Sequence, residues 1–266
     1  MLSEERNGNF TSSEIVALTT NGKAKDTFGA PFYTYIEECN MERRLKRSIS
    51  CEENARPLSW GKLCERYVCD NPEILGLEYS VNLSDTTRHP TIDCWLGSED
   101  VLKEDTVGDI KSPKTLKSFC QLVDAIVMVE ADGVWVMDGT QTMNNIRFGW
   151  VDKNGFERKK HPDGEKYYWQ LVSNGTIHNK KFAELIVFVP YKSELSELKK
   201  LALVLDAESG VYQYSWVANA NDSELPYLND SGIYKNKTVI RFEIPQEDKD
   251  FLTSRVLSAS KLLENW

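Results

Sequence analysis

Two short runs organise this chain: Thr91-Ile92-Asp93-Cys94-Trp95-Leu96 and, after a loop rich in acidic residues, Thr106-Val107-Gly108-Asp109-Ile110-Lys111. Both have the apolar and β-branched composition that is typical of strands. Successive side chains of a strand point to opposite faces, so Asp109 and Lys111 share one face. If the two runs pair as a hairpin, Asp93 comes to lie beside Asp109.

Such a pairing places two carboxylates and an ammonium group at the edge of a buried sheet. That arrangement is costly unless something compensates the charge. A divalent cation between Asp93 and Asp109 compensates it, so the stretch predicts hard-metal chemistry. The alternative is an exposed hairpin whose surface ion pair contributes little to stability. An acid two residues before a lysine also occurs at Glu157, Glu197 and Glu247, so the strand context is what separates Asp109 from them.

The composition indicates an ordinary globular protein. Of the 266 residues, 41% are hydrophobic and 27% are charged, which is enough apolar mass for a sizeable core. No run of 18 apolar residues occurs and the first residues are polar, so we expect a cytoplasmic protein without a membrane partner. All six cysteines lie in the first half without CxxC spacing, which favours buried free thiols over a disulfide scaffold or a zinc site.

The net charge of −9 argues against a protein that coats DNA with its whole surface. A local basic surface remains compatible with nucleic-acid binding, and such binding would be sensitive to salt. The densest positive cluster ends a helix predicted from Pro31 and consists of Arg43, Arg44, Lys46 and Arg47. The ordinary interpretation of this cluster is a solvated helix face. The more specific interpretation is a surface that contacts the phosphates along a nucleic-acid backbone.

Near the N-terminus, Thr11 and Glu14 fit a capping box and predict a short helix. Free backbone N–H groups at a helix start, with the serine hydroxyls beside them, are suited to hold a phosphate. Arg6 lies a few residues upstream and is placed to close on the same anion. The alternative is an ordinary helix cap beside a solvated arginine.

The rest of the chain alternates helical and β patterns, which predicts one α/β domain over residues 1–266. Further helices are predicted over 59–70 (with Ser59 as its cap and Glu65 bordering its apolar stripe), 114–130, 165–172, 195–205 and 247–263. Further strands are predicted over 74–83, 134–136, 146–151, 183–189 and 238–244, with a hairpin turn at 152–155. Residues 131–164 are interpreted as a β-rich insertion, and residues 192–266 as a C-terminal embellishment.

The order of these pieces resembles the PD-(D/E)XK nuclease superfamily, and within it the phage lambda exonuclease / YqaJ viral recombinase family. The segment from Arg6 to Ser13 is similar to that family's Arg-x-Gly-x-x-Thr-x-Ser motif. Trp60-Gly61-Lys62 followed by Glu65 is similar to its Trp-Gly-x-x-x-Glu helix, and Tyr167-Tyr168-Trp169-Gln170 to its Tyr-x-x-Gln segment. The resemblance runs from about Arg6 to Tyr191, with a looser similarity in the last strand and helix.

The chain departs from the family pattern at several positions. Ile92-Asp93 stands for the Pro-Asp of the superfamily name, and Asp109 stands where relatives often have glutamate. Both changes keep the carboxylate. The tryptophan expected just before the leading arginine is missing, and Leu2 stands in that region. Residues 131–164 have no counterpart in the family pattern.

The resemblance implies a restriction-endonuclease-like core, a central mixed sheet flanked by helices, with a metal-dependent active site. In it, Asp93, Asp109, Glu65 and the carbonyl of Ile110 bind Mg²⁺ or Mn²⁺, and Lys111 and Gln170 complete the catalytic group. Arg6 and Ser13 hold the terminal 5′-phosphate of duplex DNA. Weaker expectations for backbone contacts fall on Arg43, Arg44, Arg47 and Arg56.

The same resemblance implies 5′→3′ digestion of double-stranded DNA ends in phage-type recombination. It further implies a single-strand annealing protein as partner and a ring-shaped homotrimer. A structure-specific or restriction-like endonuclease would keep the metal residues without needing Arg6 and Ser13. A Cas4-like iron–sulfur nuclease is disfavoured because no cysteine follows Cys120. The non-enzymatic alternative is a catalytically silent DNA-binding module on the same fold.

Overall fold

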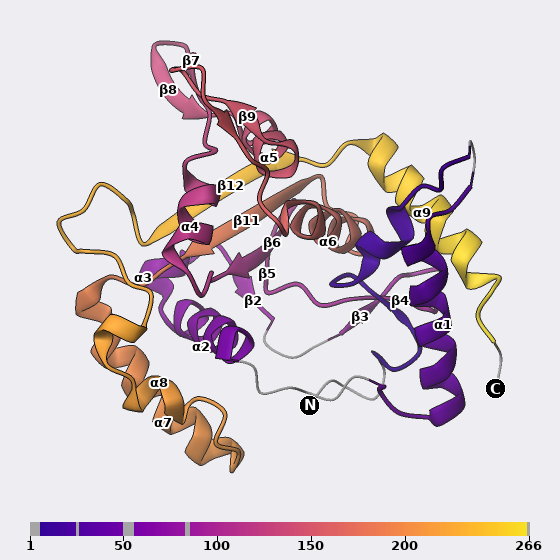
Figure 1. The fold of residues 1–266 in the computed structure, drawn as a ribbon, viewed down its shortest axis with the longest axis horizontal. Coiled ribbons are helices and arrows are strands. Elements are labelled where there is room, and N and C mark those ends of the chain that lie inside the picture. The colour runs from indigo at the N-terminus through magenta and orange to yellow at the C-terminus, as the bar shows by residue number, and fades with distance from the viewer. Residues whose placement is uncertain (1–5, 25–26, 50–55, 83–85, 265–266) are drawn as a thin grey trace.

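The centre of the molecule is a five-stranded mixed sheet (Figure 1). The structure, a computed structural model, describes residues 6–24, 27–49, 56–82 and 86–264. The strand order is β12 (Lys237–Glu243), β11 (Phe182–Phe188), β6 (Thr106–Lys111), β5 (Val101–Lys103) and β2 (Ser80–Val81). β11 and β6 run parallel, whereas the other neighbouring pairs are antiparallel. The prediction of an α/β protein built on a central mixed sheet is therefore confirmed.

Strand β11 is covered on both faces, as its nearly continuous apolar sequence predicts. Leu185 and Val187 belong to one hydrophobic cluster, and Ile186 and Phe188 belong to a second. The alternation follows from the two-residue period of a strand. The sheet thus separates two cores.

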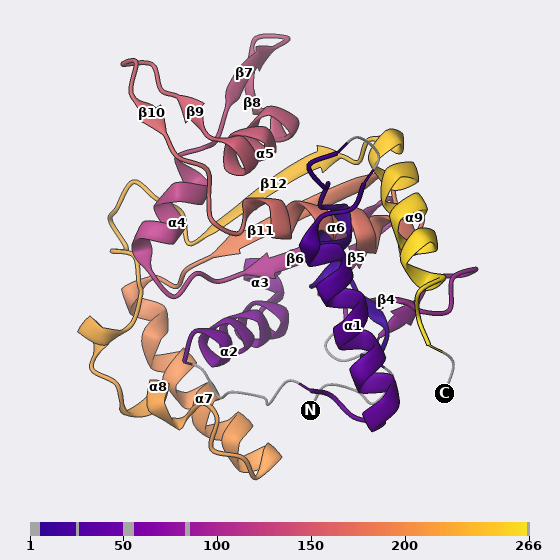
Figure 2. The ribbon, with the colours of Figure 1, turned by 45° about the vertical axis from the view of Figure 1, so that its right-hand side comes forward.

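Helices supply the remainder of both cores (Figures 1 and 2). The Leu185 cluster takes side chains from α1 (Ala30–Leu45), α4 (Leu116–Val123), α5 (Gly139–Phe148), α6 (Gly164–Ile177) and α9 (Gln246–Ser260). The Ile186 cluster takes them from α2 (Arg56–Asp70), α3 (Pro72–Leu75), α7 (Leu195–Ser209) and α8 (Ser215–Asn219). No described helix combines the length and apolar composition needed to span a membrane.

A second, small sheet shows that the predicted hairpin is wrong. In it β4 (Trp95–Gly97) lies between β1 (Phe10–Thr11), which is parallel to it, and β3 (Thr87–Arg88), which is antiparallel. The partners of β6 are instead β5 and β11. A two-residue turn at Glu104-Asp105 closes β5 onto β6, and such a tight local hairpin leaves the earlier run free for other partners.

Residues 128–160 form an arm in which two hairpins, joined by the partly buried helix α5, project beyond β12 (Figures 1 and 2). The first hairpin pairs β7 (Met128–Ala131) with β8 (Val134–Met137), and the second pairs β9 (Trp150–Val151) with β10 (Glu157–Arg158). The turn predicted at 152–155 is confirmed, with the N–H of Gly155 donating to the carbonyl of Asp152. The strand predicted over 146–151 is mostly wrong, because α5 occupies Gly139–Phe148 and is capped by Asp138.

Several predicted boundaries shift where tertiary packing overrides local signals. The helix over 114–130 ends at Val123, and the strand over 74–83 reduces to β2. Helix α6 continues past Asn174-Gly175 to Ile177. Gly175 therefore does not end the helix. Its lack of a side chain allows close packing on Ile244, because a Cβ at this position would lie 2.2 Å from Ile244 Cδ1.

Two predicted helix caps are wrong. The segment after Glu14 is a 3₁₀ helix (Ile15–Thr19) without a side-chain cap, and Thr11 belongs to β1. Ser59 lies buried inside α2 and accepts a hydrogen bond from Trp216 Nε1. The start of α1 is confirmed, with Pro31 in its first turn. Two further 3₁₀ helices, Lys192–Glu194 and Asp222–Glu224, complete the described elements.

Candidate active site

The carboxylate of Asp109 is the centre of the site. It lies on β6 and is almost completely buried. Gln170 Nε2, from α6, donates to Asp109 Oδ1 at 2.6 Å. Lys111 Nζ lies 2.5 Å from Asp109 Oδ2. Asp109, Lys111 and Gln170 therefore meet as the sequence predicts.

Asp100 also joins this group and was not among the predicted site residues. The register of the β5–β6 hairpin puts Lys103 opposite Thr106 and Val101 opposite Gly108, which places Asp100 next to Asp109. Asp100 Oδ2 accepts a hydrogen bond of 2.6 Å from the N–H of Ile110. Burial, reinforced by the charges of Asp109 and Glu65, raises the pKa of Asp100 well above its ordinary value.

Glu65, on α2, is close enough to interact electrostatically with the same group. Burial raises its pKa to about 7, with Asp109 adding to the rise and Lys111 opposing it. Burial alone would lower the pKa of Lys111, but the charges of Asp109 and Asp100 outweigh it and leave that pKa raised. Three carboxylates and one ammonium group therefore share a poorly solvated region with an excess of negative charge.

The structure does not bring Asp93 into the cluster. Asp93 is exposed in a turn just before β4, and its carbonyl accepts a hydrogen bond from Arg88. The expectation rested on pairing β4 with β6, which does not occur. A signal for Asp100 was present, because a two-residue turn at Glu104-Asp105 fixes which residue faces Asp109.

Tyr167 is a second residue of the site that was not predicted from the sequence. Its ring centroid lies 5.5 Å from Lys111 Nζ. Burial raises the pKa of Tyr167 to about 12. The ring also stacks on His161, whose Nε2 is 2.8 Å from Ser118 Oγ. This contact links the Lys111 ammonium to the start of α6 and to α4.

The donor set suits a hard divalent cation. Carboxylate oxygens from Glu65, Asp100 and Asp109 are the ligands that Mg²⁺ and Mn²⁺ prefer. Asp109 Oδ2 is fully buried and has the Lys111 ammonium as partner without a well-aligned hydrogen bond. Among the residues that the structure describes, no three acidic, histidine or cysteine side chains already surround a common point. The fit therefore rests on the chemistry and the charge excess of these groups.

Arg6 and Ser13 lie together, as the sequence predicts. Arg6 Nη2 donates to Ser13 Oγ at 3.3 Å. Ser13 Oγ is 3.3 Å from Thr11 Oγ1, and Thr11 N–H donates to the hydroxyl of Tyr35. Burial lowers the pKa of Arg6. A half-buried guanidinium beside two hydroxyl groups is suited to bind an anion.

The Arg6 group and the acidic cluster are held by the same helix, α6. Ser12 Oγ lies 2.7 Å from Ser173 Oγ, which also accepts a hydrogen bond from Trp95 Nε1. Glu14 forms an ion pair with Lys166, the residue next to Tyr167. The N-terminal segment therefore packs along the helix that carries Gln170.

The four arginines expected to contact the DNA backbone occupy different environments. Arg43 is engaged within the chain, where it donates to the carbonyls of Gly8 and Glu264 and to Asn9. Arg44 forms ion pairs with Glu37 and Glu264. Arg47 and Arg56 are exposed, and Arg56 lies over the ring of Trp216.

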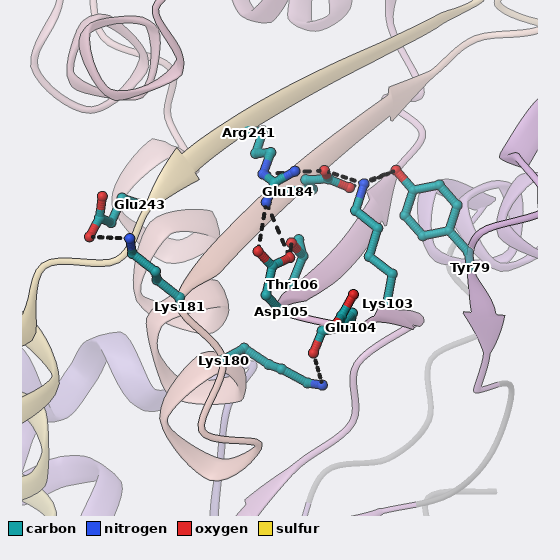
Figure 3. A network of polar contacts seen from close by, with 10 residues as sticks. All are labelled: Tyr79, Lys103, Glu104, Asp105, Thr106, Lys180, Lys181, Glu184, Arg241 and Glu243. Carbon is teal, nitrogen blue, oxygen red and sulfur yellow. Dashed lines mark hydrogen bonds and ion pairs between the residues drawn. The ribbon is translucent and has the colours of Figure 1, made fainter.

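A second polar network fixes the opposite end of β6 (Figure 3). Its centre is Glu184 on β11, which is 1% exposed. Glu184 accepts a hydrogen bond of 2.6 Å from the Tyr79 hydroxyl and forms an ion pair of 2.7 Å with Lys103. Arg241 joins Glu184 to Asp105 in the β5–β6 turn. These contacts support the hairpin register that brings Asp100 to Asp109.

The fold is similar to that of three solved exonuclease structures. No protein-family model and no curated protein matches the chain. LHK-Exo in complex with dAMP has a TM-score of 0.55 at 13% identity, over 98% of this chain and 91% of that one. The alkaline exonuclease LHK-Exo from Laribacter hongkongensis gives 0.53 at 14%, over 97% and 89%. A phage-related exonuclease from Haemophilus somnus 129PT gives 0.56 at 11%, over 96% and 92%.

Proposed function

We propose that this chain is a metal-dependent DNA exonuclease that digests linear duplex DNA 5′→3′ from a 5′-phosphorylated end. One observation carries the proposal: Glu65, Asp100, Asp109, Lys111 and Gln170 converge from α2, the β5–β6 hairpin and α6. The shared fold with solved exonucleases supports it. One of these structures holds dAMP, the kind of mononucleotide that a DNA exonuclease releases.

In this proposal Asp100, Asp109 and Glu65 hold Mg²⁺ or Mn²⁺, with the carbonyl of Ile110 as a further oxygen ligand. The bound cation would lower the pKa of a water molecule and stabilise charge on the scissile phosphate. Lys111 places positive charge beside the phosphate and orients the attacking water. Gln170 holds Asp109 in position, and the Tyr167 ring lies beside the Lys111 ammonium and helps to position it.

The proposal assigns Arg6 and Ser13 to the terminal 5′-phosphate of the digested strand. Arg47 and Arg56, both exposed, are proposed to contact the DNA backbone, with Arg43 and Arg44 as weaker contributors because they already have partners in the chain. A homotrimer and a single-strand annealing partner belong to the same proposal. A restriction-like endonuclease that uses the same acids is the second candidate.

Incubation with Mg²⁺ and a linear duplex bearing one 5′-phosphorylated end tests this function. We expect mononucleotides to be released from the phosphorylated strand, and a chelator to stop the release. A closed circular duplex should stay intact, because it offers no terminal phosphate to Arg6. Cleavage of the circle would favour the endonuclease, and binding without cleavage of either substrate would favour a silent module.

The Arg6→Ala variant tests, in the same experiment, whether Arg6 recognises the 5′-phosphate. We expect it to lose the preference for a phosphorylated over a hydroxyl end, since the guanidinium beside Ser13 is removed. Cleavage of the hydroxyl end should continue. An unchanged preference in this variant would contradict the assignment of Arg6.

The raised pKa of Glu65 predicts how stability depends on pH, both without metal and with it. Because the pKa of Glu65 is raised from 4.5 to about 7, the folded state binds more protons than the unfolded state between those values. Stability without metal should therefore fall as the pH rises through this window. Mg²⁺ should raise the melting temperature more at pH about 8 than at pH about 5, because protonated carboxyls bind it poorly.

Differential scanning calorimetry of the parent and of Glu65→Gln checks this prediction. The variant should show a weaker pH dependence and a smaller shift with Mg²⁺. An equal Mg²⁺ shift at both pH values would exclude these carboxyls as the metal site.

A further inference from the structure

The second hairpin of the arm is basic in an acidic protein. We call residues 147–160 the basic hairpin. Its basic side chains are Arg147, Lys153, Arg158, Lys159 and Lys160, and its acidic ones are Asp152 and Glu157. The whole chain carries a net charge of −9, so this local excess of positive charge opposes the overall balance.

Three of these cations are free to meet an external anion. Arg158 is paired with Asp152, and Arg147 with Glu165. Lys153, Lys159 and Lys160 are exposed and form no ion pair with any residue in the described ranges. Lys153 lies in the turn of the hairpin, and Lys159 and Lys160 lie in the connection from β10 to α6.

Exposed aromatic rings accompany the lysines. Phe148 is 62% exposed and Phe156 is 64% exposed. Phe156 is held at the hairpin turn by hydrogen bonds of its N–H to Asp152 Oδ1 and of its carbonyl to Asp152 N–H. The Arg147 guanidinium lies 4.6 Å from the centroid of the Phe148 ring. Cations interleaved with exposed aromatic rings are typical of surfaces that bind unpaired nucleic acid, where rings stack on bases and cations contact phosphates.

The basic hairpin is fixed to the proposed active site. A Cβ on Gly149 would lie 2.5 Å from the carbonyl of Arg158, so the two sides of the hairpin are in close contact. His161 N–H donates to the carbonyl of Ile146, and the next residues enter α6. His161 stacks on Tyr167, which covers Lys111. This chain of contacts connects the base of the basic hairpin to Lys111.

The neighbouring hairpin does not share this character. β7 and β8 expose Val134, Trp135 and Val136, but residues 128–138 contain Glu130, Asp132 and Asp138 and no lysine or arginine. Negative charge without a compensating cation disfavours contact with phosphates. Within the two hairpins of the arm, the positive charge is therefore confined to the basic hairpin.

We propose that the basic hairpin binds single-stranded DNA, namely the strand that becomes unpaired as its partner is digested. The inference rests on the proposed exonuclease function and extends it by assigning a site for the second strand. Lys153, Lys159 and Lys160 contact phosphates. Phe148 and Phe156 stack on bases, which are accessible only in a single strand, so single-stranded DNA is favoured over duplex.

Binding of a fluorescent oligo-dT without a 5′-phosphate, measured in the presence of a chelator, tests the proposal without cleavage. The triple variant Lys153→Ala/Lys159→Ala/Lys160→Ala should reduce the slope of log affinity against log salt by about 2, since each lost phosphate contact contributes about 0.7 on single strands. Phe156→Ala should weaken binding about tenfold. Lys200→Ala, an exposed lysine on α7, is the matched control and should bind like the parent.

Phe156→Leu separates stacking from simple apolar contact, because it keeps a large apolar side chain without a ring. Weakening similar to that of Phe156→Ala supports stacking. Parental salt slope and affinity in the lysine and Phe156 variants would overturn the proposal. So would equally tight binding of a duplex of the same length, or a change in oligomeric state in Phe156→Ala by light scattering, which would indicate a contact between copies.

The two proposals fail separately. If linear duplex is digested but the variants bind oligo-dT as the parent does, only the single-strand site is wrong. If the variants lose binding as expected while the parent digests no duplex, the single-strand site stands, but the exonuclease assignment, and with it digestion as the source of the bound strand, is wrong.

Discussion

Asp100→Asn should remove nearly all nuclease activity, lowering the turnover rate by about 10²-fold or more, because metal stabilisation of the transition state contributes several kcal/mol. The substitution keeps the shape of the side chain and an oxygen that accepts from the N–H of Ile110. It removes the charge that lies next to Asp109. Release of nucleotides from a 5′-phosphorylated linear duplex in saturating Mg²⁺ measures the effect.

Asp93→Asn is the control for this prediction. Asp93 is exposed in a turn outside the cluster, so the variant should digest DNA at the parental rate. The melting temperature of Asp100→Asn should not fall, since burial already raises the pKa of Asp100 and a neutral side chain suits the site. An active Asp100→Asn together with an inactive Asp93→Asn would contradict the assignment.

Lys103→Met should lower the free energy of unfolding by about 3 kcal/mol. Lys103 pairs with Glu184 at 2.7 Å, and their side chains are 19% and 2% exposed. Methionine fills a similar volume but leaves the Glu184 carboxylate buried with less compensation. The Tyr79 hydroxyl would remain, while Arg241 lies 4.0 Å away. Urea unfolding followed by far-ultraviolet circular dichroism measures the loss.

Lys181→Met is the matched control from the same part of the molecule (Figure 3). Its ion pair with Glu243 spans 3.5 Å between side chains that are 61% and 59% exposed. Solvent screens such a pair, so the variant should lose less than about 0.5 kcal/mol. The double variant Lys103→Met/Glu184→Leu should regain much of the lost stability, because no unpaired buried charge remains. Equal losses for Lys103→Met and Lys181→Met would refute a special role for burial.

The helices and strands with strong periodic patterns are where the sequence was most informative. The apolar run that became β11 and the alternating run that became β6 were predicted within a residue or two. A continuous apolar run indicates a strand that is buried on both faces, and an alternating run indicates one that is buried on a single face. Both patterns can be seen in the residues of the strand itself. The arm was predicted less well, because α5 carries few large apolar residues and the run around Ile146 resembles a strand.

The prediction of the acidic cluster was wrong at one residue for a different reason. The Asp109–Lys111 contact follows from strand periodicity within six residues, and Gln170 was placed only by a family resemblance. Choosing Asp93 over Asp100 required knowing which run pairs with β6. Register depends on hydrogen bonds between segments, so composition alone does not fix it.

The sequence by itself determined the α/β class, the strands β6 and β11, the pairing of Asp109 with Lys111, and the proximity of Arg6 to Ser13. These features depend on residues close in the chain or on a recognisable motif. Only the tertiary structure decided that Asp100 faces Asp109, that Tyr167 covers Lys111, and that Arg43 is engaged by Gly8. Each of those contacts joins segments whose local patterns are compatible with several partners, and only packing of the whole chain selects among them.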